Sequence, residues 1–274
     1  PLRLSIDLRV QSVMREELID DMTEFKAIGA TGLVMDVRNG EIISMISLPD
    51  FNPNQPGDMS GDAAFNRATK GVYEMGSTFK LFTAAMALDS GTISMAGGYD
   101  ASKPIRVARF TIKDFHAKNR WLSVPEIILH SSNIGAAKMA VDVGGPAQRA
   151  YLGKLGFLKP PGLELPEVGA PLMPSVWRPI NTMTISYGHG ISVSPVQVIT
   201  GVTALVNGGI YRKPTLLKQR IPPMAGHQVI KPETSRKMRS LMRLVVSKGT
   251  GRRADVQGYL IGGKTGTAEK AVSR

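Results

Sequence analysis

The stretch ATGLVMDVRNGEIISMISL, residues 30–48, decides the fold class. Two runs rich in apolar and β-branched residues, Ala30–Val37 and Glu41–Leu48, flank the turn sequence Arg38–Gly40. An Asn-Gly pair between two such runs is a strong signal of an antiparallel hairpin, because both residues tolerate the positive φ that the turn requires. The sequence therefore predicts a β-hairpin near the start of the chain.

Outside this hairpin the sequence predicts mainly helices. Apolar residues at helical spacing predict an amphipathic helix over Leu8–Phe25, before the hairpin. Residues 49–61 and 158–179 are rich in Pro and Gly and are expected to be irregular. Tyr259–Thr267 is predicted to close the chain as a strand. Further helices are predicted over Ser77–Asp89, Val124–Leu129, Ile134–Val141, Val196–Leu205 and Glu233–Lys248.

Strands at both ends of the chain, with a helical block between them, predict an α+β domain. The terminal parts, residues 1–60 and 211–274, are expected to build one antiparallel sheet. Residues 61–210 are expected to form a mainly helical part, and a cleft between the two parts is the expected place for a site.

The composition narrows the class of protein. The 274 residues carry 34 Lys and Arg against 22 Asp and Glu, a net charge of +12, and no Cys. The length suits one large domain or two intimate subdomains. Without Cys the chain has no disulfide, thiolate zinc site or thiol nucleophile. The basic excess indicates an anionic partner, such as nucleic acid, a membrane surface or an acidic polymer, or only a solvated basic surface.

Ser77-Thr78-Phe79-Lys80 stands at the start of a predicted helix. Residues three apart lie on one helix face, so the Ser77 hydroxyl and the Lys80 amine can meet. A lysine can take the proton of a serine when burial and neighbouring cations disfavour its own charged form. The helix N-terminus supplies N–H donors suited to a developing oxyanion. The alternative interpretation is a helix cap followed by a surface lysine.

Two other polar clusters have both a catalytic and a structural interpretation. Ser131-Ser132-Asn133 lies in the break between two predicted helices, where it can face a groove or only cap a helix. Lys264-Thr265-Gly266-Thr267 lies on the last predicted strand. It can bind a carboxylate, or it can be an edge strand whose lysine prevents pairing with another strand.

The ordered trio SxxK, SxN and KTG matches the active-site set of penicillin-binding proteins and serine β-lactamases. Longer segments extend the match, among them GVYEMGSTFKLFTAAMALDSG (71–91) and TISYGHGISVSPVQVITGVTALVNGGIYRKPTLL (184–217). From about Leu4 to Lys270 the chain resembles the transpeptidase domain of division-specific class B penicillin-binding proteins, of penicillin-binding protein 3 type. Met75 departs from the proline that many relatives carry. The resemblance implies a penicillin-binding/serine β-lactamase-like fold, with an antiparallel sheet flanked by helices and an all-helical subdomain.

The resemblance also implies an activity and a set of roles. The activity is a peptidoglycan D,D-transpeptidase that cross-links stem peptides during cell division through a serine acyl-enzyme. Ser77 would be the nucleophile and Lys80 its general base. Ser131 would relay a proton to the leaving amine, and Asn133 would hold the substrate amide and orient Lys80. The further roles implied are support of the proton network by Lys264, carboxylate binding along Thr265, Gly266 and Thr267, and an oxyanion hole from the N–H groups of Ser77 and Thr267.

The resemblance implies partners and a location as well. β-Lactams would mimic the donor peptide and trap Ser77, and a membrane glycan polymerase and other divisome proteins would be partners. The expected location is the periplasmic face of the bacterial inner membrane at the division site, with an anchor outside this chain. No cofactor, metal or nucleic acid is expected. The histidines are interpreted as structural: His116, His130, His189 and His227.

Several alternatives remain open at this point. A serine β-lactamase, a carboxypeptidase or a β-lactam sensor would share the fold. A β-lactamase often uses a dedicated glutamate to activate water, and Glu164 and Glu167 lie downstream of Asn133, in a stretch that we interpret as a loop. A basic nucleic-acid-binding module and a catalytically inactive scaffold are the remaining alternatives; clustered basic residues with interleaved aromatics would favour the former.

The resemblance carries one expectation about the sheet. In this superfamily two strands and a helix follow the KTG strand, and the two strands separate it from the N-terminal hairpin. Only ten residues follow Lys264 here. We therefore expect the natural chain to continue past Arg274. We also expect the hairpin and the KTG strand to lie about two strand spacings apart, roughly 14 Å, without direct hydrogen bonds.

Overall fold

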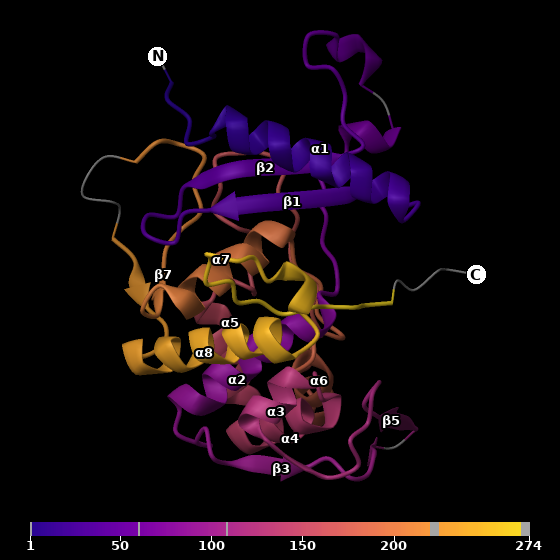
Figure 1. Ribbon diagram of the computed structural model, residues 1–274, viewed down its shortest axis with the longest axis vertical. Coiled ribbons are helices and arrows are strands. Elements are labelled where there is room, and N and C mark those ends of the chain that lie inside the picture. The colour runs from indigo at the N-terminus through magenta and orange to yellow at the C-terminus, as the bar shows by residue number, and fades with distance from the viewer. Residues whose placement is uncertain (1, 60, 108, 220–224, 270–274) are drawn as a thin grey trace.

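The computed structural model describes residues 2–59, 61–107, 109–219 and 225–269. The predicted hairpin is confirmed: β1 (Ala30–Met35) pairs antiparallel with β2 (Ile42–Leu48) in Figure 1. In the turn, Gly40 has a φ of +83°, and the side-chain oxygen of Asn39 accepts a hydrogen bond from the N–H of Glu41. The Asn-Gly pair thus supplies both the positive φ and a local hydrogen bond.

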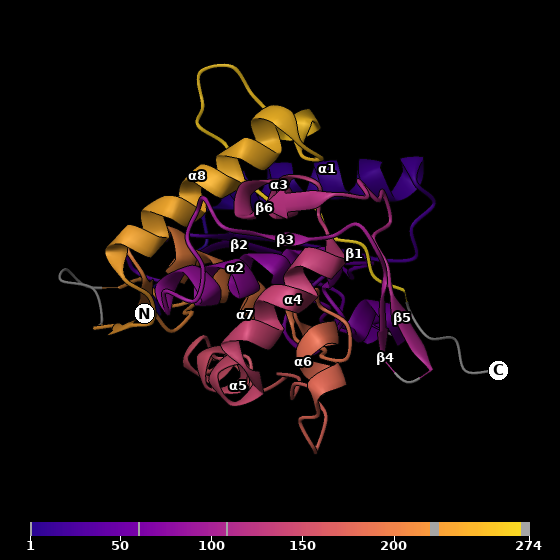
Figure 2. The same cartoon turned by 90° about the horizontal axis from the view of Figure 1, so that it is seen from below.

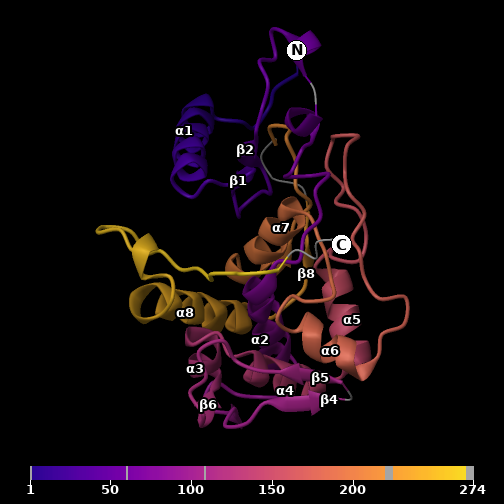
Figure 3. The same ribbon diagram turned by 90° about the vertical axis from the view of Figure 1, so that its right-hand side faces the viewer.

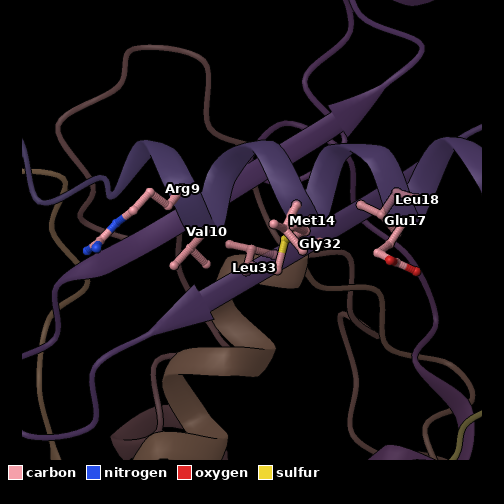
Figure 4. Close-up of a pocket in the computed structure, with 8 residues that line it drawn as sticks. Arg9, Val10, Met14, Glu17, Leu18, Gly32 and Leu33 are labelled. Atoms are coloured by element: carbon pink, nitrogen blue, oxygen red, sulfur yellow. The ribbon is translucent and has the colours of Figure 1, made fainter.

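Two helices sandwich the hairpin. Figure 3 shows α1 (Leu8–Glu24) and α7 (Pro195–Val206) on opposite sides of it. Along β2, fully buried residues alternate with half-buried ones, as the two-residue period of a strand with one more deeply covered face predicts. An apolar groove of about 770 Å³ remains between α1 and β1, where Figure 4 shows Val10, Met14 and Leu33. This groove is formed by elements that carry none of the predicted catalytic residues.

The helical part is built around α2 (Lys80–Asp89), whose residues from Lys80 to Leu88 are all buried. A helix that is apolar on every side needs neighbours on every side. The helices that contact α2 are α3 (Val124–Leu129), α4 (Asn133–Val143), α5 (Gly145–Lys154), α7 and α8 (Pro232–Lys248), as Figures 1 and 2 show. Helix α6 (Pro179–Ile185) packs against α4 and α5. The α2 helix is therefore the central, buried helix of this part.

The other elements are short. The described residues form three more antiparallel strand pairs: β3 (Gly98–Asp100) with β6 (Trp121–Ser123), β4 (Ile105–Val107) with β5 (Phe110–Ile112), and β7 (Ile210–Tyr211) with β8 (His227–Gln228). They also form four 3₁₀ turns: η1 (Pro56–Asp58), η2 (Gly61–Ala64), η3 (Gly76–Phe79) and η4 (Arg252–Ala254). None of the helices in the described ranges has the length and apolarity needed to cross a membrane.

Most predicted elements are confirmed. The predicted helices agree with the observed ones to within a few residues, and residues 158–179 are irregular before α6 begins. Helices α5 and α6 and the short strand pairs were not predicted. The predicted helix over Ser77–Asp89 begins as the 3₁₀ turn η3 and continues as α2.

The prediction of a strand over Tyr259–Thr267 is wrong. The segment lies along α8, where the N–H of Gly263 donates to the carbonyl of Met242. A strand exists only with a hydrogen-bonded neighbour, and within the described ranges β1 pairs only with β2. No hydrogen bond of the described residues joins residues 259–267 to the hairpin, so the two ends of the chain do not share one sheet there.

An aromatic cluster beneath the start of α2 yields a test of the core. The rings of Phe79, Phe82 and Phe157 pack with centroids 4.7 to 5.4 Å apart, and Phe157 is fully buried. We expect Phe157→Ala to lower the free energy of unfolding by about 3–5 kcal/mol, measured by urea denaturation, because it leaves a cavity among these rings. Phe115→Ala, at a side chain that is 91% exposed, is the control and should change stability by less than about 0.5 kcal/mol. Equal losses in the two variants would contradict this view of the core.

Candidate active site

The first part of the site is the turn that opens α2. Ser77 lies in η3 and Lys80 is the first residue of α2, so both side chains project from the same face. The Lys80 amine lies 2.6 Å from the Ser77 hydroxyl oxygen, and only 1% of Lys80 is exposed. Burial of a side chain that ends in an amine is costly unless the amine is paired or neutral.

The second part is the turn between α3 and α4. Ser131 has a φ of +58°, a conformation that a residue with a Cβ seldom adopts. In this conformation it meets both lysines: Lys80 Nζ lies 2.8 Å from the Ser131 carbonyl and 3.0 Å from its hydroxyl. Lys264 Nζ lies 2.9 Å from the same hydroxyl. The Ser131 hydroxyl therefore connects the two amines.

The pKa values of both lysine amines are lower than that of an ordinary lysine. Burial and, to a smaller extent, the positive charge of Lys264 lower the pKa of Lys80 to about 7, against the opposing effect of Asp114. Burial lowers the pKa of Lys264 to about 8. Close to neutral pH, Lys80 is thus present in part as a neutral amine, which is the form that can accept the Ser77 proton.

The third part is the segment Lys264–Thr267, which packs against the start of η3. A Cβ on Gly76, whose φ is +54°, would collide with the carbonyl oxygen of Thr267. A Cβ on Gly266 would lie 2.7 Å from the carbonyl oxygen of Met75. Only glycines allow this approach, which brings the backbone of Thr267 beside the turn that carries Ser77.

The structure thus brings Ser77, Lys80, Ser131 and Lys264 into one hydrogen-bonded cluster, and other predicted residues have different partners. Asn133 Nδ2 donates to the carbonyl of Lys113 at 3.0 Å. No hydrogen bond of the described residues joins Asn133 to Lys80, so the orienting contact implied by the resemblance is not made here. The choice of partner depends on the loop that contains Lys113, which the motif does not specify.

The threonines of the KTG segment differ from each other. The Thr265 hydroxyl shares a hydrogen bond of 2.7 Å with the hydroxyl of Thr250, which follows α8. Thr267 is exposed, as is Gly266. Carboxylate binding by Thr265 would therefore require its hydroxyl to exchange Thr250 for the ligand.

Sequence reasoning missed Asp114. Its carboxylate accepts hydrogen bonds from the Ser132 hydroxyl at 2.7 Å and from the N–H of Ile134 at 2.9 Å. Ser132 in turn caps α4 by accepting from the N–H of Gly135. Asp114 therefore fixes the turn that presents Ser131. A single Asp in a polar loop has no periodicity, so the sequence carried no signal that could have found it.

The two glutamates considered for water activation are engaged elsewhere. Glu164 accepts from the Thr215 hydroxyl at 2.7 Å and from the N–H of Leu216 at 2.9 Å. Glu167 accepts from the Asn66 amide at 3.4 Å. Both lie in the irregular stretch, as predicted, and neither bonds to Ser77 or Lys80 among the described residues.

Comparison with known proteins identifies the family. A family model described as the penicillin binding protein transpeptidase domain matches residues 30–274. The chain belongs to this family. The chain is 43% identical over 276 residues to the probable peptidoglycan D,D-transpeptidase FtsI of Caulobacter vibrioides, covering 98% of this chain and 46% of that protein. It is 31% identical over 272 residues to the peptidoglycan D,D-transpeptidase FtsI of Escherichia coli, with the same coverage.

Solved structures agree. The apo transpeptidase domain of Burkholderia pseudomallei penicillin-binding protein 3 superimposes with a TM-score of 0.89 at 32% identity, covering 99% of this chain and 79% of that one. The family resemblance and the predicted α+β fold class are therefore confirmed. The chain spans about half the length of the curated relatives it matches.

The lowered pKa of Lys80 leads to a test by folding stability. An unfolded lysine has a pKa near 10.5, whereas that of Lys80 in the fold is about 7. Between these values the unfolded state binds the extra proton, so the stability of the wild type should rise with pH by up to about 1.4 kcal/mol per unit. Lys80→Met removes this contribution.

We expect the free energy of unfolding of the wild type minus that of Lys80→Met to increase from pH 7 to pH 10, measured by denaturant titration at each pH. Lys248→Met, at an exposed position near the end of α8, is the matched control for loss of a lysine. A difference that stays constant across this pH range would show that Lys80 is protonated in the fold throughout.

Proposed function

We propose that this chain is the transpeptidase domain of a cell-division peptidoglycan D,D-transpeptidase that works through an acyl-enzyme on Ser77. The observation that carries the proposal is the 2.6 Å hydrogen bond between a fully buried Lys80 amine and the Ser77 hydroxyl. The names of the relatives from C. vibrioides and E. coli, both peptidoglycan D,D-transpeptidases, support the reaction class.

In the first half-reaction, neutral Lys80 takes the proton of Ser77 while the serine oxygen attacks the carbonyl of the penultimate D-Ala of a stem peptide. The N–H groups of Ser77 and Thr267 stabilise the resulting oxyanion. The proton then passes from Lys80 through the Ser131 hydroxyl to the amine of the terminal D-Ala. The amide C–N bond breaks, free D-Ala leaves, and an ester on Ser77 remains.

In the second half-reaction, the side-chain amine of a second stem peptide attacks this ester. The amine loses a proton to the Lys80–Ser131 network, Ser77 recovers a proton, and the new amide bond is the cross-link. The positive charge of Lys264 and the segment Thr265–Thr267 hold the donor's terminal carboxylate before it leaves. Asn133 holds the substrate amide once that amide displaces the Lys113 carbonyl.

The same site accounts for the proposed partners. A β-lactam presents a strained amide and a carboxylate in place of the donor peptide, so it would acylate Ser77. The proposed location is the periplasmic face of the inner membrane at the division site. A membrane glycan polymerase and other divisome proteins are the proposed partners of the full-length protein.

The first test is the position of the covalent adduct. After treatment with penicillin and proteolysis, mass spectrometry should place the adduct on the peptide that contains Ser77, and Ser77→Ala should give none. Lys80→Ala should lower the acylation rate by about 10²–10⁴-fold, because it removes the general base. Ser90→Ala, at the other end of α2, is the control and should label at the wild-type rate. An adduct on another serine, or labelling of Ser77→Ala, would refute the assignment.

The second test is the lifetime of the acyl-enzyme. After a short pulse of labelled penicillin and removal of free drug, the label should persist for many minutes, because Glu164 and Glu167 are engaged in structural hydrogen bonds. The measurement is the loss of label with time. Release within seconds would support the β-lactamase alternative instead.

A further inference from the structure

Glu74 lies three residues before Ser77, and the mechanism above does not use it. One carboxylate oxygen accepts a hydrogen bond from the N–H of Gly190, and the other bonds to Nδ1 of His189, both at 2.8 Å. The Glu74 side chain is 25% exposed. Since a carboxylate only accepts, Nδ1 of His189 is the donor in this pair. Glu74 therefore joins the turn that follows α6, by hydrogen bonds, to the segment that directly precedes Ser77.

This turn rests directly on Gly76. The N–H of Gly76 donates to the carbonyl of Gly188 at 3.3 Å, and a Cβ on Gly188 would collide with the Gly76 backbone. Three residues earlier, Tyr73 and Val193 exchange two backbone hydrogen bonds of 3.0 Å each. Backbone hydrogen bonds thus join residues 73–76 to residues 188–193 at both ends of this stretch. Glu74 adds a side-chain link between those two ends.

Gly76 also touches the KTG segment. A Cβ on Gly76 would collide with the carbonyl oxygen of Thr267, so both the Gly188 turn and the KTG segment contact Gly76. The peptide unit that follows Gly76 carries the N–H of Ser77. Its orientation is consequently set by how firmly these two neighbours hold Gly76.

We propose that Glu74 is a positioning residue for the oxyanion hole: by holding residues 188–190 against Gly76, it fixes the peptide that carries the Ser77 N–H. The proposal rests on the proposed function above. A donor in an oxyanion hole contributes about 10²–10³-fold to rate only when it is correctly placed. Partial loss of this placement is therefore expected to cost about 10–100-fold.

The geometry separates this role from a role of the negative charge. Glu74→Asp keeps the charge but shortens the side chain by one methylene, so it cannot reach Gly190 from the same backbone. Glu74→Gln removes the charge but keeps a side-chain oxygen at the right length, and His189 can change tautomer to accept from the amide. If Glu74 acts by position, the Asp variant is impaired and the Gln variant is not.

The experiment measures acylation by a chromogenic β-lactam over a range of drug concentrations, which separates the limiting acylation rate from the affinity of the non-covalent complex. For Glu74→Asp and Glu74→Ala we expect the limiting rate to fall by about 10–100-fold, with affinity within about threefold of wild type. Glu74→Gln should stay within about threefold in both. The pH at which the rate reaches half its maximum, set by Lys80, should not move in any variant.

Asp142→Asn is the matched control, because Asp142 accepts a tertiary hydrogen bond from the Tyr99 hydroxyl at the far end of α4. It should leave the limiting rate unchanged. A wild-type rate in Glu74→Asp, a Gln variant as slow as the Ala variant, or an equal loss in Asp142→Asn would overturn the proposal.

A second measurement distinguishes failure of this proposal from failure of the proposed function. Amide exchange of Gly76, which donates to Gly188, should be at least about tenfold faster in Glu74→Asp than in the wild type and unchanged in Glu74→Gln. If wild type forms no adduct on Ser77, the proposed function fails, and the exchange of Gly76 still decides whether Glu74 holds the turn. Equal exchange in all variants would show that it does not.

Discussion

The burial of the Lys80 amine is the constraint on which the rest of the site depends. An ammonium group among apolar side chains is costly, and its hydrogen-bond partners are the Ser77 hydroxyl and the hydroxyl and carbonyl of Ser131, which carry no charge. The positive charge of Lys264 adds to the cost of protonation. These two effects bring the pKa of Lys80 close to neutrality, where a lysine can serve as a base.

A buried amine requires hydrogen-bond partners that are held in place. The fold supplies these partners from distant parts of the chain. The contact of Lys80 with Ser131 joins residues 51 apart, and that of Lys264 with Ser131 joins residues 133 apart. Helix α2 is buried along its length, so the Lys80 backbone is held on all sides. The positive φ of Ser131 persists because Asp114 and the α4 cap hold the residues that directly follow it.

The features that could be predicted from the sequence are those determined by residues close together along the chain. The Asn-Gly hairpin, the helices and the meeting of Ser77 with Lys80 depend on local periodicity and on the spacing of three. The features it could not predict depend on a tertiary neighbour. Residues 259–267 needed a paired strand, and Asn133 and Thr265 bond to Lys113 and Thr250, which no motif contains.

The carboxylates near the site make structural hydrogen bonds. Asp114 and Glu74 each accept from a backbone N–H of a distant segment and so hold two loops together. The groups that meet Ser77 and Ser131 are lysines. A carboxylate turned toward Lys80 would raise its pKa and keep it protonated, as the opposing effect of Asp114 shows. Since the side chains that bond to Ser77 and Ser131 in the described part of the chain are lysines, Lys80 has no carboxylate partner there to keep it protonated.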